Sequence, residues 1–227
     1  MTFTVIIMVC IMGSVVWWTV RQTIGTQPWN AAESTQDVND IGFVSSEDGL
    51  RTPSMKIGLG VFLAVATSIF ALFISAYLIR MELNDWRPLA EPALLWANTT
   101  LLVLSSICLQ WAVVAGRRDD YQTMLKGLLG GGVLAIAFLV GQLMAWNQLA
   151  ATGMYLNTNP ANTFFYLMTA IHGLHLLGGI YVWGRTMFRS KSGMEKDRVR
   201  LAVELCATYW HFLLVIWLVL FALLSST

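Results

Sequence analysis

The sequence FFYLMTAIHGLHLLGG, residues 164–179, places two histidines and several glycines in a run that is otherwise apolar. A histidine in hydrocarbon is costly, so His172 and His175 are each expected to have a polar partner or water. Glycines at such a position allow another backbone to approach closely. This stretch therefore predicts a membrane-spanning helix with a closely packed, polar face, and its histidines mark the first place to look for function.

The composition of the whole chain agrees with this interpretation. Of its 227 residues, 56% are hydrophobic and 12% are charged, and the mean hydropathy is +0.63. A soluble domain carries about 25% charged residues, so the sequence predicts an integral membrane protein. The net charge of +1 gives no reason to expect nucleic-acid binding. The three cysteines lie in apolar stretches without a CxxC pattern, which favours buried thiols over disulfides or zinc.

Six segments are long and apolar enough to cross a bilayer, which takes about 20 residues. The fold class is therefore predicted as all-α, a polytopic membrane bundle with one N-terminal helix and a five-helix core. The first segment has no Lys or Arg ahead of its apolar run and no small-residue cleavage site after it, so it is interpreted as a retained helix. The predicted spans are 3–20, 57–79, 93–116, 127–149, 163–184 and 201–224.

Three parts follow from this assignment: an N-terminal transmembrane helix over 1–20, a linker over 21–56 and a five-helix bundle over 57–227. The linker is polar and shows no apolar periodicity, which is typical of a segment in water. Of the 14 Lys and Arg residues, all but Arg80 and Arg87 fall in the loops after the first, third and fifth helices. The positive-inside rule therefore predicts that these loops are cytoplasmic and that both termini lie on the periplasmic side.

Tryptophan and glycine positions add packing expectations. Trp210 and Trp217 lie deep in the last helix and are expected to pack against neighbouring helices. Gly127 and Gly131 form a small-xxx-small pair, so this face of the fourth predicted helix should pack closely on another helix. The tryptophans near predicted helix ends are expected to form interfacial belts; they are Trp17, Trp18, Trp86, Trp96, Trp111, Trp146 and Trp183.

Polar residues at membrane depth are expected to serve mainly as hydrogen-bonding groups between helices. This expectation covers His172, His211, Asn98 and Gln142, together with Thr99, Ser105, Ser106 and Gln110 on the third predicted helix. Three histidines and Glu204 could also bind zinc, copper or haem iron. Because a metal centre needs further ligands and supporting carboxylates, packing is the favoured interpretation and no metal or catalytic residue is assigned.

The order and spacing of the motifs in this sequence resemble those of the haem–copper oxidase subunit III family over residues 56–224. The most specific motifs are Phe165-Tyr166 followed by His172-Gly173-Leu174-His175 and Gly179, and Glu204 followed by Tyr209-Trp210-His211-Phe212 and Trp217. Supporting motifs are Lys56-Ile-Gly-Leu, Phe62-Leu63-Ala64, Ser75-Ala76-Tyr77, Asn98-Thr99 with Ser105-Ser106, and Gly141-Gln142 ahead of Trp146.

The resemblance implies a non-catalytic subunit III of a terminal oxidase, most naturally cytochrome c oxidase, in aerobic electron transport. It implies haem and copper on partner subunits, none on this chain, contact with subunit I, subunit II in the same complex, and phospholipid held between helix groups. It also implies lipid-binding roles for His175, Arg189 and Glu204. The implied location is the bacterial inner membrane, in a proton-translocating complex.

Three carboxylates that the family commonly carries are replaced here by Ala66, Ala145 and Leu214. This departure weakens any proton-antenna role or carboxylate-dependent lipid role and leaves the structural role intact. The alternatives that remain are the equivalent subunit of a quinol oxidase or nitric oxide reductase, an independent membrane transporter, and a metalloenzyme using His172, His175 and His211. No internal repeat is evident, and the prolines lie in predicted loops, which disfavours the transporter.

Overall fold

The fold is known from a computed structural model, which describes residue 17 and residues 47–83, 86, 94–153, 159–191 and 196–225. The chain divides into two compact units, Met1–Thr67 and Ser68–Thr227. The predicted N-terminal helix lies outside the described residues apart from Trp17, as does most of the predicted linker. The account below concerns the second unit and the helix that enters it.

Five long helices follow one another along the described chain: α2 (Glu47–Met81), α3 (Leu94–Arg117), α4 (Tyr121–Ala151), α5 (Pro160–Lys191) and α6 (Lys196–Ser225). Each contains a stretch long and apolar enough to cross a membrane. The all-helical membrane fold and the five spans of the predicted core are confirmed.

The helices begin or end beyond the apolar runs that reveal them in the sequence. Hydropathy detects the part of a helix that lies in hydrocarbon, whereas the backbone stays helical until a cap or a breaker stops it. α2 begins at Glu47, inside the segment expected to be a linker. α5 begins at Pro160, since proline fits the first helical position, where no backbone N–H is needed.

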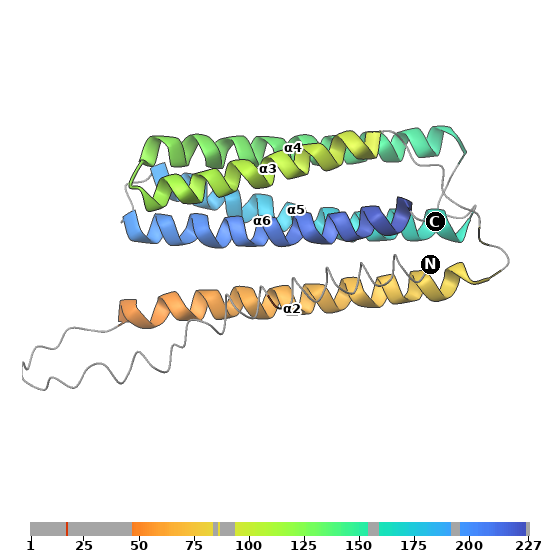
Figure 1. Ribbon diagram of the computed structural model, residues 1–227, viewed down its shortest axis with the longest axis horizontal. Helices are drawn as coiled ribbons and strands as arrows, with labels where there is room; N and C mark the ends of the chain where they lie inside the picture. Colours follow the sequence, from red (N-terminus) through yellow and green to blue (C-terminus); the bar gives the residue numbers. More distant parts are fainter. Residues whose placement is uncertain are drawn as a thin grey trace, which may run out of the picture. The chain divides into compact units, whose positions relative to one another are not determined.

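Helices α3, α4, α5 and α6 form a bundle in which α3 packs on α4 and α6, and α5 packs on the same two helices. They run alternately up and down, so the end of α3, the start of α4, the end of α5 and the start of α6 lie together (Figure 1). The hydroxyl of Tyr121 donates to the backbone oxygen of Ser190 at this end, tying α4 to α5. Arg117, Arg118 and Arg189 are exposed there.

A tight turn at Arg118–Asp120 joins α3 to α4. Asp119 has a φ of 59°, the left-handed conformation that Asp tolerates better than most residues. Asp120 caps α4, and its carboxylate accepts a hydrogen bond from the backbone N–H of Thr123 at 3.1 Å. The side-chain and backbone hydrogen bonds with Thr123 hold the pKa of Asp120 below its ordinary value of 3.8.

This cap predicts a pH-dependent difference between the wild type and Asp120→Asn. Because the folded-state pKa is lowered, the charge stabilises the fold above the ordinary value of 3.8, and this contribution is lost as the pH falls through the lowered value. Asn caps a helix about as well as Asp. The wild type should therefore have the higher melting temperature near pH ~7, and the melting temperatures of the two proteins should converge in acid. A difference in melting temperature that is independent of pH would contradict this assignment.

The α3–α4 contact depends on glycine, as the small-xxx-small pair predicted. A Cβ atom on Gly127 would lie 2.8 Å from the backbone oxygen of Cys108 and 2.9 Å from the backbone nitrogen of Ala112. At Gly131, the backbone oxygen accepts a hydrogen bond from Ser105 Oγ at 2.7 Å. The two backbones are therefore in direct contact, and the predicted close packing is confirmed.

Tryptophan side chains lie both in the interior of the bundle and on its surface. Trp210 and Trp217 are fully buried, which confirms their predicted packing role. Trp96 lies at the start of α3 and is 62% exposed, as a residue of an interfacial belt would be. Trp111 is 56% exposed but lies further from the end of that helix, beside Gln110. Trp183 differs from that expectation, because its indole lies over Gly132 and donates to the backbone oxygen of Leu128 at 2.7 Å. It therefore joins α5 to α4.

Candidate functional site

Two predicted packing residues meet in the interior between α3 and α4. Asn98 and Gln142 are buried, and Asn98 Nδ2 donates to Gln142 Oε1 at 3.4 Å. Gly141 makes room for them, since a Cβ there would collide with the Asn98 amide. The contact joins α3 to α4, and a buried amide pair of this kind fixes how the two helices pair.

His172 lies at the centre of the bundle with no exposed surface. Its ring centroid is 5.2 Å from that of Trp217, 6.0 Å from Phe138 and 6.4 Å from Phe70. Neither ring nitrogen has a hydrogen-bond partner among the described residues, in contrast to the polar partner expected from the sequence. The imidazole packs as an aromatic ring, and it forms a T-shaped pair with Phe138 at an interplanar angle of 82°.

His175 faces a different environment one turn further along α5. Its Nδ1 donates to the backbone oxygen of Ile171 at 2.8 Å, and its ring centroid is 5.4 Å from that of Phe70. Its own backbone oxygen accepts a hydrogen bond from the Tyr209 hydroxyl at 2.8 Å. This bond attaches α6 to α5 where Gly179 brings the helices together, because a Cβ there would lie 2.9 Å from the Tyr209 ring.

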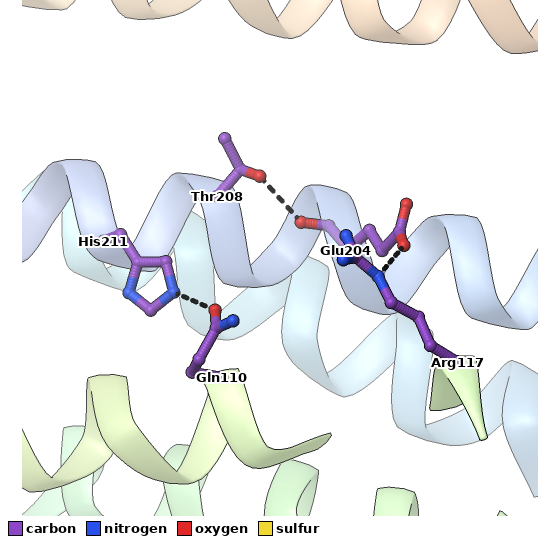
Figure 2. A network of polar contacts seen from close by, with 5 residues as sticks. All are labelled: Gln110, Arg117, Glu204, Thr208 and His211. Atoms are coloured by element: carbon purple, nitrogen blue, oxygen red, sulfur yellow. Dashed lines mark hydrogen bonds and ion pairs between the residues drawn. The ribbon is translucent and has the colours of Figure 1, made fainter. Parts of the chain in front are cut away.

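A ladder of polar contacts, here called the α3–α6 seam, joins Ser106, Gln110 and Arg117 on α3 to Glu204 and His211 on α6. Figure 2 shows the side chains of the last four residues projecting between the two helices. Arg117 Nε donates to Glu204 Oε1 at 3.0 Å, and His211 Nε2 donates to Gln110 Oε1 at 3.0 Å. Ser106 Oγ hydrogen-bonds to His211 Nδ1. His211 thus contacts two residues of α3 from its place on α6.

The seam also defines the protonation pattern of His211. The carbonyl oxygen of Gln110 can only accept, so Nε2 carries a hydrogen. In a neutral ring Nδ1 then accepts, and the hydroxyl of Ser106 is the donor. Both ring nitrogens are engaged in contacts to α3, so the imidazole serves as a bridge between two helices.

The Arg117–Glu204 ion pair should contribute little to stability. The two side chains are 63% and 30% exposed, and exposed pairs are worth about 0–1 kcal/mol. Glu204→Gln should therefore lower the free energy of unfolding by less than about 1 kcal/mol. A double-mutant cycle with Arg117→Gln, measured by chemical denaturation, gives the coupling directly. A coupling above about 2 kcal/mol would contradict this expectation.

The three residues assigned to lipid by resemblance, His175, Arg189 and Glu204, lie on α5 and α6. Glu204 pairs with Arg117, while Arg189 is exposed near the end of α5. Arg117 is the partner that sequence reasoning missed. The sequence contains a signal for this pairing, because the spacing from Gln110 to Arg117 equals the spacing from Glu204 to His211. Two such pairs can face each other across two antiparallel helices.

The histidines are distributed over separate environments. His172 packs among aromatic rings, and His211 bridges to Gln110 and Ser106. Within the described part of the chain, no three His, Cys, Asp or Glu side chains come together as a metal site requires. The geometry defines a class of protein, a polytopic helical membrane protein whose intramembrane polar groups join helices.

The comparisons with known proteins identify the family. The sequence model described as cytochrome c oxidase subunit III matches residues 5–225. A protein named cytochrome c oxidase subunit 3 from Thermostichus vulcanus is 33% identical over 173 residues, 74% of this chain and 85% of the relative. One of the same name from Synechocystis sp. is 32% identical over 178 residues, 75% of each chain. The chain belongs to the cytochrome c oxidase subunit III family of the haem–copper oxidases.

A third relative has a name that joins two subunits. The protein named heme-copper oxidase subunit I+III from Aeropyrum pernix is 28% identical over 127 residues, which is 56% of this chain and 16% of the relative. The family match and the two relatives named cytochrome c oxidase subunit 3 confirm the resemblance inferred from the sequence motifs at the level of the family.

Proposed function

We propose that this chain is the non-catalytic third subunit of a proton-translocating cytochrome c oxidase, which stabilises the catalytic subunit and holds structural phospholipid. In this proposal haem and copper are carried by partner subunits, subunit I is the main contact and subunit II lies in the same complex. The observation that carries the proposal is the family match over residues 5–225. The relative whose name joins subunits I and III supports subunit I as the partner.

The use of the intramembrane polar residues supports a structural role. His211 bridges α3 and α6 through both ring nitrogens, and His172 packs against Trp217 and Phe138. Asn98 and Gln142 pair with each other. Side chains committed to joining helices are suited to a rigid support for a neighbouring subunit.

The distribution of charge supports the proposed orientation in a bacterial inner membrane. Basic residues lie in the last turns of α3 and α5 and in the first turns of α6. These segments lie together at one end of the bundle, with the start of α4 (Figure 1). By the positive-inside rule this end is cytoplasmic, in a bacterial inner membrane. Both chain termini then lie on the periplasmic side.

A purification with the tag on this chain tests the proposal. We expect a large haem- and copper-bearing subunit to co-purify, with oxidation of reduced cytochrome c by the intact complex. The chain separated from that complex should show no haem absorbance. Stoichiometric haem on the separated chain, or the absence of a haem-bearing partner, would refute the proposal.

The lipid role makes a specific prediction for Arg189. This exposed residue lies close to the basic end of α5, where its guanidinium can reach a lipid phosphate. Arg189→Ala should reduce bound anionic lipid and shorten the working life of the complex, while the initial turnover stays nearly unchanged. Lipid content by mass spectrometry and the rate of inactivation during turnover check this. Unchanged values in both measurements would count against a lipid site at Arg189.

A further inference from the structure

The α3–α6 seam leaves polar groups exposed at membrane depth. His211 lies at the middle of the α6 span, Arg198–Ser225. Gln110 is exposed and lies two helical turns before Arg117, which ends α3. At a rise of about 1.5 Å per residue, Gln110 is about 10 Å deeper along α3 than Arg117. An amide is therefore presented on the outer surface of the bundle within the apolar layer.

One of the two polar groups of the Gln110 amide already has a hydrogen-bond partner. Gln110 Oε1 accepts the hydrogen bond from His211 Nε2, but the amide nitrogen has no hydrogen-bond partner among the described residues. An amide N–H facing hydrocarbon without an acceptor costs free energy, because no water is present to replace the missing bond. Lipid chains are therefore the wrong covering for this surface, and a group with an acceptor oxygen is the right one.

The surface around the amide fits a packed helix. Ile107 lies one turn from Gln110 on α3, and Leu218 lies two turns from His211 on α6; both are exposed. A polar centre flanked by apolar side chains is typical of contacts between transmembrane helices. By contrast, every exposed side chain on α4 from Leu129 to Met144 is apolar, as a lipid-facing surface requires.

We propose that a transmembrane helix of the catalytic haem–copper subunit covers the outer face of the α3–α6 seam and supplies a carbonyl or hydroxyl oxygen to the amide nitrogen of Gln110. The inference rests on the proposed function for the identity of the partner. The relative whose name joins subunits I and III supports the catalytic subunit as the source of this helix.

Site-specific photo-cross-linking in native membranes tests which surface meets the partner. The cross-linking residue p-benzoylphenylalanine replaces Ile107 or Leu218 beside the seam, with Val140 on α4 and Leu174 on α5 as matched exposed controls. Irradiation should join this chain to the catalytic subunit from the two seam positions, at about ten times the yield from the controls.

Three results of the cross-linking experiment would overturn the inference. These are adducts with the catalytic subunit from the controls but not from the seam, adducts between two copies of this chain, and internal adducts with residues 3–20. If the tagged catalytic subunit retains none of this chain before irradiation, it is the proposed function that fails.

A pair of substitutions tests the amide itself. Gln110→Leu removes the donor, and the chain should dissociate from the detergent-purified complex about tenfold faster than the wild type. Thr100→Val is the matched control, since the exposed Thr100 hydroxyl on the same helix donates to the Trp96 backbone oxygen of its own helix. The control should dissociate at the wild-type rate. Equal rates for the two variants would overturn the role of the amide.

Discussion

Gly127→Ala should destabilise the protein by about 2 to 3 kcal/mol, although it adds a single methyl group. The added Cβ would lie 2.8 Å from the backbone oxygen of Cys108 and 2.9 Å from the backbone nitrogen of Ala112. Backbone atoms within a helix cannot rotate aside as a side chain can, so α3 and α4 must separate. That separation also strains the nearby bond from Ser105 to the backbone of Gly131.

Gly130→Ala provides the matched control on the same helix. A Cβ at Gly130 would meet Cys108 Sγ at 3.6 Å, an ordinary van der Waals contact. Alanine is also a better helix former than glycine by roughly 0.5–1 kcal/mol. We therefore expect Gly130→Ala to be neutral or slightly stabilising in thermal unfolding of the purified protein. Similar losses for both variants would show that backbone contact does not limit the α3–α4 spacing.

Trp217→Ala should have the largest effect of any substitution considered, a loss of about 3 to 5 kcal/mol. The side chain is 1% exposed, and it contacts the rings of Phe138 at 4.9 Å and His172 at 5.2 Å between centroids. Its Nε1 donates to Thr99 Oγ1 at 2.9 Å. Removing it leaves a cavity where α3, α4, α5 and α6 meet, and packing contacts are the main attraction between helices in a membrane.

Two further variants separate the components of this effect. Trp217→Phe keeps a ring but loses the indole N–H, so it should cost less than Trp217→Ala, with about 1 kcal/mol arising from the lost hydrogen bond. Trp111→Ala removes an indole that is 56% exposed and should change stability by less than about 1 kcal/mol. Chemical denaturation of the four proteins gives the comparison. An equal loss for the two alanine variants would refute the central role of Trp217.

The five helices of the core could be predicted from hydropathy because each needs an apolar run to cross the bilayer. Their ends could not, since α2 and α4 continue into charged residues whose helical state depends on capping and turn geometry. Asp120 illustrates this, because its capping role depends on the left-handed turn at Asp119.

The polar residues of the site were recognised as interhelix groups, but their partners were not assigned. The pairing of Glu204 with Arg117, or of His211 with Gln110, depends on the relative height of two helices distant in sequence. Hydropathy carries no information on that height. His172 shows the opposite case, because its cost as a buried polar ring was evident from the sequence while its aromatic surroundings appear only in the fold.

The spacing of the α3–α6 seam determines the register between the two helices. The contacts of Arg117 with Glu204 and of Gln110 with His211 are two helical turns apart on both helices. Shifting α6 by one turn, about 5.4 Å, would break both contacts and place His211 opposite a different part of α3. A shift of α6 along α3 would therefore separate both pairs of polar partners at once. An insertion of one residue between Glu204 and His211 would rotate one of them away from α3 by about 100°, and a subunit altered in this way would lose its internal alignment without losing any apolar residue.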